Sequence, residues 1–125
     1  METGNCIREC ADGQQIARSK HELDLAGSTI DSLSNVMSLA GNGVRLKILY
    51  LLHNENRLCV CDITDILEMK TPAISQHLKK LHAGGIIESE RVAKRIYYSL
   101  SSNYNELLLP LFNLIEKNQN IRKVS

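Results

Sequence analysis

The chain has 125 residues, of which 43% are hydrophobic and 23% charged, and its formal net charge is +1. This length allows one compact domain rather than two of ordinary size, and the composition excludes a fully disordered, collagen-like or low-complexity chain. No apolar run approaches the ~20 residues that span a bilayer and no signal peptide opens the chain, so we expect a cytoplasmic protein with reduced thiols.

The N-terminal third is expected to hold an arm and two helices. Residues 1–13 carry few apolar side chains and predict a mobile arm. A short helix over residues 14–25 follows, and a second helix capped by Ser28 or Thr29 presents apolar side chains at helical spacing up to Ala40.

Three more helical segments lead to the centre of the chain. Asn42 caps a helix that ends near residues 54–56, and residues 58–67 form a shorter one. Thr71-Pro72 predicts the next helix start, with Thr71 as N-cap and Pro72 as first helical residue. That helix ends at Gly84-Gly85, where glycine permits a left-handed stop.

Two strand-like runs and a last helix complete the pattern. Residues 86–91 and 95–100 predict a hairpin, and residues 103–117 a helix that Pro110 kinks. The predicted fold is mainly α with a small β-hairpin, a winged helix-turn-helix. The expected organisation is an arm (1–13), a DNA-binding and dimerisation domain (14–117) and a C-terminal tail (118–125).

The small net charge conceals an asymmetry. Residues 69–95 contain six basic and two acidic residues, a net charge of +4, which leaves −3 for the rest. A positive segment on one helix and one hairpin is typical of a phosphate-binding surface, although each charge taken singly is more typical of a solvated face. The residues expected to contact DNA phosphates or base edges are Thr71, Ser75, Gln76, His77, Lys79, Lys80, Arg91, Lys94 and Arg95.

The four cysteines form two short-spaced pairs. Cys59 and Cys61 can turn their sulfurs towards one point if Cys59 is the N-cap of a helix, where the dipole also favours thiolates. Cys6 and Cys10 lie in the arm at a spacing that shares one helical face. Asp62 supplies an oxygen ligand or a hydrogen bond. Four thiolates favour a soft metal ion (Cd, Pb, Hg, Zn or Bi), whereas a buried core thiol is the plain alternative for Cys61.

Several segments resemble the ArsR/SmtB family of metal-responsive repressors over roughly residues 30–115. The resemblance rests on four segments: Gly41-Asn42-Gly43-Val44-Arg45-Leu46-Lys47-Ile48-Leu49, Leu58-Cys59-Val60-Cys61-Asp62-Ile63, Ser75-Gln76-His77-Leu78-Lys79-Lys80-Leu81 and Ile96-Tyr97-Tyr98-Ser99-Leu100. The extra N-terminal pair makes the chain similar to the cadmium- and lead-sensing branch. That resemblance implies that Cys6 and Cys10 of one subunit reach Cys59 and Cys61 of the other, with Cys6 the firmer arm ligand.

Three departures narrow the resemblance. Thr64 stands where the arsenic-sensing branch places a third cysteine. Residues 101–125 contain no His and no Asp, so we expect no zinc site on the last helix. The segment from Arg91 to Arg95 lacks the glycine at which relatives often turn the wing, which predicts a longer or differently shaped tip.

These observations predict a homodimeric repressor rather than an enzyme. The dimer binds near-palindromic operator DNA through two recognition helices and is released when metal binds, which links it to heavy-metal resistance. The expected dimer-interface residues are Met37, Leu108, Leu111, Phe112 and Ile115. One alternative is a thiol redox-responsive repressor that uses the same cysteines. A second is a thiol enzyme or metal carrier, although the chain has no Cys-x-x-Cys motif and no phosphate-binding loop.

Overall fold

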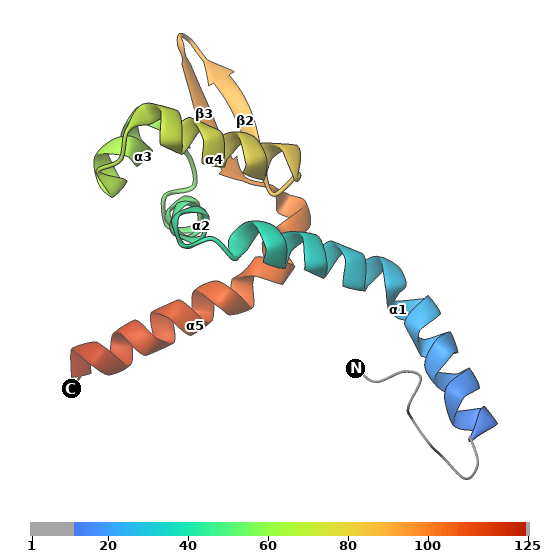
Figure 1. Ribbon diagram of the computed structural model, residues 1–125. Coiled ribbons are helices and arrows are strands. Elements are labelled where there is room, and N and C mark those ends of the chain that lie inside the picture. Colours follow the sequence, from blue (N-terminus) through green and yellow to red (C-terminus); the bar gives the residue numbers. More distant parts are fainter. Residues whose placement is uncertain (1–11, 125) are drawn as a thin grey trace. The chain divides into compact units, whose positions relative to one another are not determined.

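The computed structural model describes residues 12–124 and the side chains of residues 12–119 (Figure 1). Its elements are α1 (Gly13–Ala40), α2 (Gly43–Glu55), β1 (Leu58–Cys59), α3 (Val60–Leu67), α4 (Thr71–Ala83), β2 (Ile87–Val92), β3 (Arg95–Leu100), the 3₁₀-helix η1 (Ser102–Tyr104) and α5 (Asn105–Val124). Two compact units divide between Ser32 and Leu33. Within residues 12–124, none of the helices combines the length and apolar character that crossing a bilayer requires.

The expected mainly helical fold with a small hairpin is confirmed, but α1 is a single helix where we predicted two. Ser28 and Thr29 were expected to start a new helix. Instead the helix runs on through Gly27, because glycine in a helix costs only about 1 kcal/mol relative to alanine and does not block the backbone hydrogen bonds.

The caps of α2 and α4 fix the ends of the helix-turn-helix. Asn42 caps α2 as predicted, since its side chain accepts a hydrogen bond of 3.1 Å from the backbone N–H of Arg45. At α4 the prediction was one residue late, because Lys70 is the N-cap and Thr71 is already helical. The predicted left-handed stop after α4 is present at Gly85, with φ of 78°.

The three strands form one antiparallel sheet in the order β1-β3-β2. The wing hairpin pairs Ile87 with Leu100 and Val92 with Arg95, so only two residues make its turn. Cys59 pairs with Tyr97, and this pairing makes residues 58–59 a strand rather than the first turn of the predicted helix. Figure 1 shows the hairpin of β2 and β3 projecting away from the helices.

One hydrophobic core fills the unit that begins at Leu33. The end of α1 is tied to it by two hydrogen bonds: Asn35 Nδ2 donates to the carbonyl of Gly84, 49 residues away, at 3.2 Å, and Arg45 Nε donates to that of Leu39 at 2.7 Å. α5 continues to Val124, beyond the expected end at residue 117, with Pro110 inside it. The buried core residues are Val36, Ala40, Ile48, Leu49, Leu52, Leu58, Ile63, Ile74, Leu78, Leu81, Ile86, Ile87, Leu108 and Phe112.

Candidate functional site

The cysteine pair lies where a strand becomes a helix. Cys59 ends β1 and is the N-cap of α3, with extended backbone angles (φ −91°, ψ 170°), and Cys61 is the second helical residue. This is the arrangement that lets two thiols at i and i+2 face the same side. Cys59 is 4% exposed, whereas Cys61 is exposed, and both are free thiols.

Asp62 closes the first turn of α3. Its Oδ2 accepts a hydrogen bond of 3.1 Å from the backbone N–H of Cys59, which completes a capping box around the strand–helix junction. This backbone hydrogen bond is the main reason that the pKa of Asp62 lies below its ordinary value. One turn further on, the Thr64 hydroxyl donates to the carbonyl of Cys61 at 2.8 Å.

Both cysteines line one groove together with residues at the tip of the wing hairpin. The groove has a volume of about 260 Å³ and is lined by Cys59, Val60, Cys61, Lys94, Arg95 and Ile96. A side-chain hydrogen bond with Tyr97, followed by the charges of Tyr97, Cys59 and Cys61, raises the pKa of Arg95 above its ordinary value. The groove therefore combines two sulfur donors with two cationic side chains.

The described residues supply only part of a metal site. Among residues 12–119, there is no group of three or more His, Cys, Asp or Glu side chains that lie close enough together to hold a metal ion. Cys6 and Cys10, the predicted arm ligands, lie outside the described residues. Two thiols at a helix N-terminus fit a soft ion chemically, and a three- or four-coordinate site needs further donors.

The predicted DNA-contacting residues occupy the exposed side of α4 and the wing. α4 turns Ile74, Leu78 and Leu81 into the core, so the opposite side of the helix faces solvent. The exposed members of the predicted set are Thr71, Ser75, Gln76, Lys79, Lys80, Arg91, Lys94 and Arg95.

His77 departs from the prediction, because its side chain is half-buried rather than on the solvent face. Its Nδ1 atom is buried and has no hydrogen-bond partner among the described residues. Burial, followed by the charges of Arg45 and Lys80, lowers the pKa of His77. A neutral, half-buried imidazole is poorly placed to contact DNA.

A second groove, which sequence reasoning missed, joins α4 to the wing. His82 Nε2 and Ser89 Oγ lie 3.3 Å apart across it, and its volume is about 310 Å³. The groove opens beside Ser75 and Lys79, two residues of the predicted DNA surface. The sequence carries no signal for this contact, because it depends on the register between a helix end and β2.

Three of the predicted dimer-interface residues are accessible. Met37 is 69% exposed, Leu111 is exposed and Ile115 is half-buried. Leu108 and Phe112, at 0% and 1% exposed, lie in the core of the protomer itself, which corrects the expectation for these two residues.

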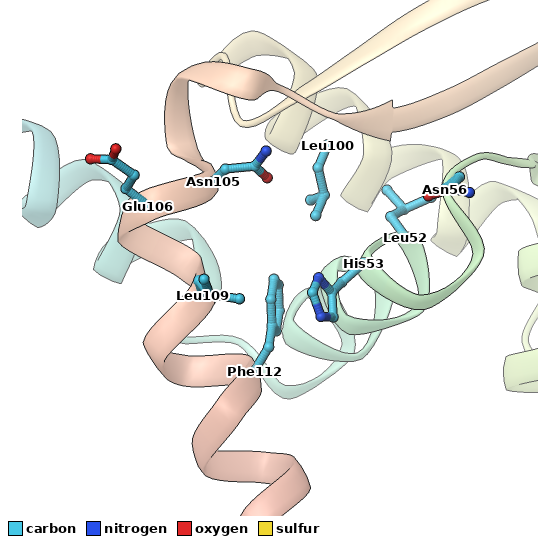
Figure 2. A pocket seen from close by; sticks show the side chains of 8 residues that line it. All are labelled: Leu52, His53, Asn56, Leu100, Asn105, Glu106, Leu109 and Phe112. Atoms are coloured by element: carbon cyan, nitrogen blue, oxygen red, sulfur yellow. The ribbon is translucent and has the colours of Figure 1, made fainter.

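Phe112 is held in place by an aromatic contact within the protomer. Its ring stacks on His53 with ring centroids 4.5 Å apart and planes inclined by 22°. The two rings face each other in Figure 2, in a pocket of about 400 Å³ at the junction of α2, β3 and α5. This stacking explains why Phe112 is not available to a partner subunit.

Comparison with known proteins agrees with this architecture. Residues 42–89 match the model of the family described as bacterial regulatory protein, arsR family. A cadmium resistance transcriptional regulatory protein, CadC, from Listeria innocua is 29% identical over 118 residues, 94% of this chain and 92% of that protein. A CadC homologue from Staphylococcus aureus is 35% identical over 86 residues, 69% of this chain and 71% of that protein.

A solved structure extends the comparison to the fold. The homodimeric winged helix-turn-helix DNA-binding domain from Mycobacterium bovis superposes with a TM-score of 0.62 at 29% identity. The match covers 78% of this chain and 86% of that one.

Proposed function

The chain belongs to the arsR family of bacterial regulatory proteins and is a winged helix-turn-helix transcriptional regulator, and from this premise we propose that it is a repressor whose operator binding is relieved by a soft metal ion. The CadC relatives, which match most of the chain, are regulators of cadmium resistance. The ion proposed as effector is Cd, Pb, Hg, Zn or Bi, bound by cysteine thiolates.

The DNA-reading half of the proposal is α4 and the wing. Gln76 presents an amide that can form two hydrogen bonds with adenine, and Ser75 can address other base edges. Lys79, Lys80 and the wing cations hold phosphates and set the register. In a homodimer, the two α4 helices face successive major grooves of a near-palindromic operator.

The proposed response to metal rests on the position of Cys59, which belongs to two elements at once. Its backbone pairs with Tyr97 of the wing, and it is also the N-cap of α3, the first helix of the helix-turn-helix. A displacement at this one residue therefore acts directly on the wing and, through α3, on the recognition helix α4 that packs against α3. A metal site at this junction would therefore lie next to the elements that position the DNA-binding residues.

In the mechanism that we propose, this chain provides the ligands and a two-state link. Cys59 and Cys61 hold the ion at the start of α3, with Cys6 and Cys10 of the arm as further donors. Thiolates of the arm and of α3 that held one soft ion in common would tie the arm to the helix-turn-helix. In the tethered dimer, the two α4 helices would no longer be spaced to enter successive major grooves. Asp62 holds the first turn of α3 in place through its hydrogen bond with the backbone N–H of Cys59.

Linkage sets the size of the response. Metal weakens DNA binding by the same factor by which DNA weakens metal binding. A typical coupling of about 1–3 kcal/mol corresponds to about a 5–150-fold change in operator affinity.

The sharpest test uses Cys61→Ser, because Cys61 is exposed and its replacement leaves the core intact. We expect the variant to bind DNA like the parent but to lose most of the release by cadmium. The sulfur-to-metal charge-transfer absorption should also weaken. Operator binding is measured by fluorescence anisotropy on a duplex selected from a random pool by the metal-free protein.

Thr64→Ser is the matched control, one turn along the same helix, and should respond to cadmium like the parent. If the Cys61→Ser variant still releases DNA fully when cadmium is added, the proposal that thiolates sense the metal is contradicted. Release by an oxidant that a reducing agent reverses, in the absence of any metal effect, would favour the redox alternative instead.

A further inference from the structure

The groove between α4 and β2 is built from one stripe of the recognition helix and one face of the wing. Ser75, Lys79 and His82 follow one another on α4 at spacings of four and three residues, so their side chains share a face of the helix. On the wing, Ser89 stands directly opposite Tyr98 in the ladder between β2 and β3, and directly opposed residues point to the same face of the sheet. Polar side chains from the helix and from the wing therefore meet in one groove.

Hydrogen-bond donors and a fixed positive charge gather in this groove. His82 Nε2 and Ser89 Oγ lie 3.3 Å apart across it. The hydroxyl of Ser75 and the ammonium group of Lys79 belong to the same lining. Among the residues that the structure describes, no carboxylate lines the groove. Its lining thus offers several donors and a positive charge to an anion.

The acidic residues of β2 face away from the groove. Side chains alternate along a strand, so Glu88 and Glu90 point to the face opposite that of Ser89. On that opposite face, Glu90 pairs with Arg57 at 3.5 Å. Arg91, two residues beyond Ser89, is the next charged residue on the groove side of β2. An anionic partner for the groove must therefore come from a ligand.

We propose that this groove holds one phosphate of the operator backbone and that His82, in its protonated form, donates a hydrogen bond to that phosphate. The inference rests on the proposed function in one respect only, that α4 and the wing contact DNA, and it does not involve the cysteines. The oxygens of one phosphate accept several hydrogen bonds at once, which suits two hydroxyls, an ammonium group and an imidazolium along one groove.

This contact makes operator binding depend on protons. Histidine is the side chain whose charge changes between about pH 5 and 8. His82 is exposed, so it exchanges protons with solvent, and its contact with Ser89 keeps the ring at the groove in the absence of DNA. A phosphate beside the ring favours the charged form, so DNA binding and protonation of His82 strengthen each other. Operator binding is therefore tighter at pH 6 than at pH 8.

The dependence of operator affinity on salt measures this contact directly. Each phosphate contact contributes about 0.9 to the slope of log affinity against log salt concentration. In the metal-free parent dimer, the magnitude of this slope should rise by up to about 2 from pH 8 to pH 6, one contact for each subunit. His82→Gln should show the slope of the parent at pH 8 at both pH values.

His21→Gln is the matched control, because His21 is an exposed histidine outside the unit that begins at Leu33. This variant should keep the pH-dependent slope of the parent. The other two histidines are poorly placed to add such a contact. His53 stacks on Phe112, and burial lowers the pKa of His77 and so keeps it neutral.

His82→Arg tests the charge itself and keeps the inference testable if His82→Gln fails to fold. A guanidinium is charged at every pH of the experiment, so the slope should be large at both pH values. The inference is overturned if either variant keeps the pH-dependent slope of the parent, or if the slope of the parent does not change with pH. A parent protein that selects no duplex from the random pool overturns the proposed function and this inference together.

A second readout counts protons. Isothermal titration calorimetry in two buffers with different ionisation enthalpies should show proton uptake when the metal-free parent binds the operator near pH 7, at most about one proton for each subunit. His82→Gln should abolish this uptake. Ser89→Ala should retain it while binding the operator about two- to ten-fold more weakly, because one donor to the phosphate is lost. Uptake that persists unchanged in His82→Gln would assign the proton to another group and overturn the inference.

Discussion

At the scale of single residues, Asp62 determines how the cysteine pair is presented. Its carboxylate accepts the backbone N–H of Cys59, so it holds the turn that brings Cys59 and Cys61 to one groove. The low pKa of this carboxyl means that the hydrogen bond favours the ionised form. The carboxylate therefore matters for stability as well as for the geometry of the site.

We predict that Asp62→Asn lowers the free energy of unfolding at pH 7 by about 0.5–1 kcal/mol, the lower part of the range for a lost helix cap. Because the folded-state pKa is depressed, the contribution of Asp62 is present above its unfolded-state pKa and is lost as pH falls through the folded-state value. The stability difference between parent and variant should therefore shrink as pH falls below about 4. Urea unfolding at a series of pH values measures this.

Asp65→Asn is the control, since Asp65 is exposed on the same helix and makes no cap. An Asp65 effect as large as that of Asp62, or a difference that stays constant down to pH 3, would contradict the capping role.

Individual residues were predictable where the signal is local. Asn42 as the N-cap of α2 follows from ordinary capping chemistry. The N-cap position of Cys59 was considered only as the condition under which both thiols share a side, while the helix itself was predicted to begin at residue 58. His77 and Phe112 were not predictable, because their burial depends on which element packs against them. The periodicity of apolar residues locates the middle of the buried face of a helix, but it does not say which residues at the margins of that face are buried.

At the scale of elements, the wing turn is the feature that the sequence left open. Without glycine, a longer or differently shaped tip was expected. The tip is not longer, because Ala93 and Lys94 make a two-residue turn, with Ala93 at φ 59°. This left-handed conformation costs a non-glycine residue about 1–2 kcal/mol. The tight turn thus carries strain that the paired strands hold in place.

We predict that Ala93→Gly stabilises the protein by about 0.5–1 kcal/mol, because relief of this strain exceeds the entropy that glycine adds to the unfolded chain. Lys94→Gly, one residue along the same turn and not at positive φ, should be neutral or destabilising. Thermal unfolding of the two variants compares them directly. A lower melting temperature for Ala93→Gly would show that the turn is unstrained.

The sequence predicted the order and type of most elements, but it predicted their first and last residues less accurately. The helix-turn-helix and hairpin were predictable from capping residues and from alternating apolar positions. The merging of two helices into α1 was not, since Gly27-Ser28-Thr29 looks like a break but each residue is tolerated in a helix. The strand β1 was not predictable either, because it exists only through its pairing with β3.

At the scale of the whole molecule, unburied apolar side chains indicate an incomplete assembly. Leu23 and Leu25 on α1 and Leu114 on α5 are exposed, and Leu114 is 57% exposed. Exposed leucines on helices of a small domain are typical of surfaces that a partner subunit covers. We place the homodimer on Leu114 together with Met37, Leu111 and Ile115, all of which belong to the unit that begins at Leu33.

We predict that Leu114→Glu weakens the dimer, because a carboxylate at an apolar interface loses its hydration without gaining a partner. The variant should sediment as a monomer at concentrations where the parent is a dimer, and its operator affinity should fall steeply, since one reading head contacts only a half-site. Asn113→Glu, a neighbouring exposed residue, controls for the added charge. A Leu114→Glu protein that remains dimeric would move the interface elsewhere.

The strand–helix junction at Cys59 also bears on how such a sensor can change over generations. An insertion or deletion that slipped the pairing of β1 with β3 by one residue would turn the side chains of the slipped strand to the opposite face. A single side-chain substitution leaves that register untouched, at Cys61 as well as at Thr64 one turn beyond it. The fold therefore lets point substitutions change the side chains beside this junction while the strand pairing that joins it to the wing is inherited intact.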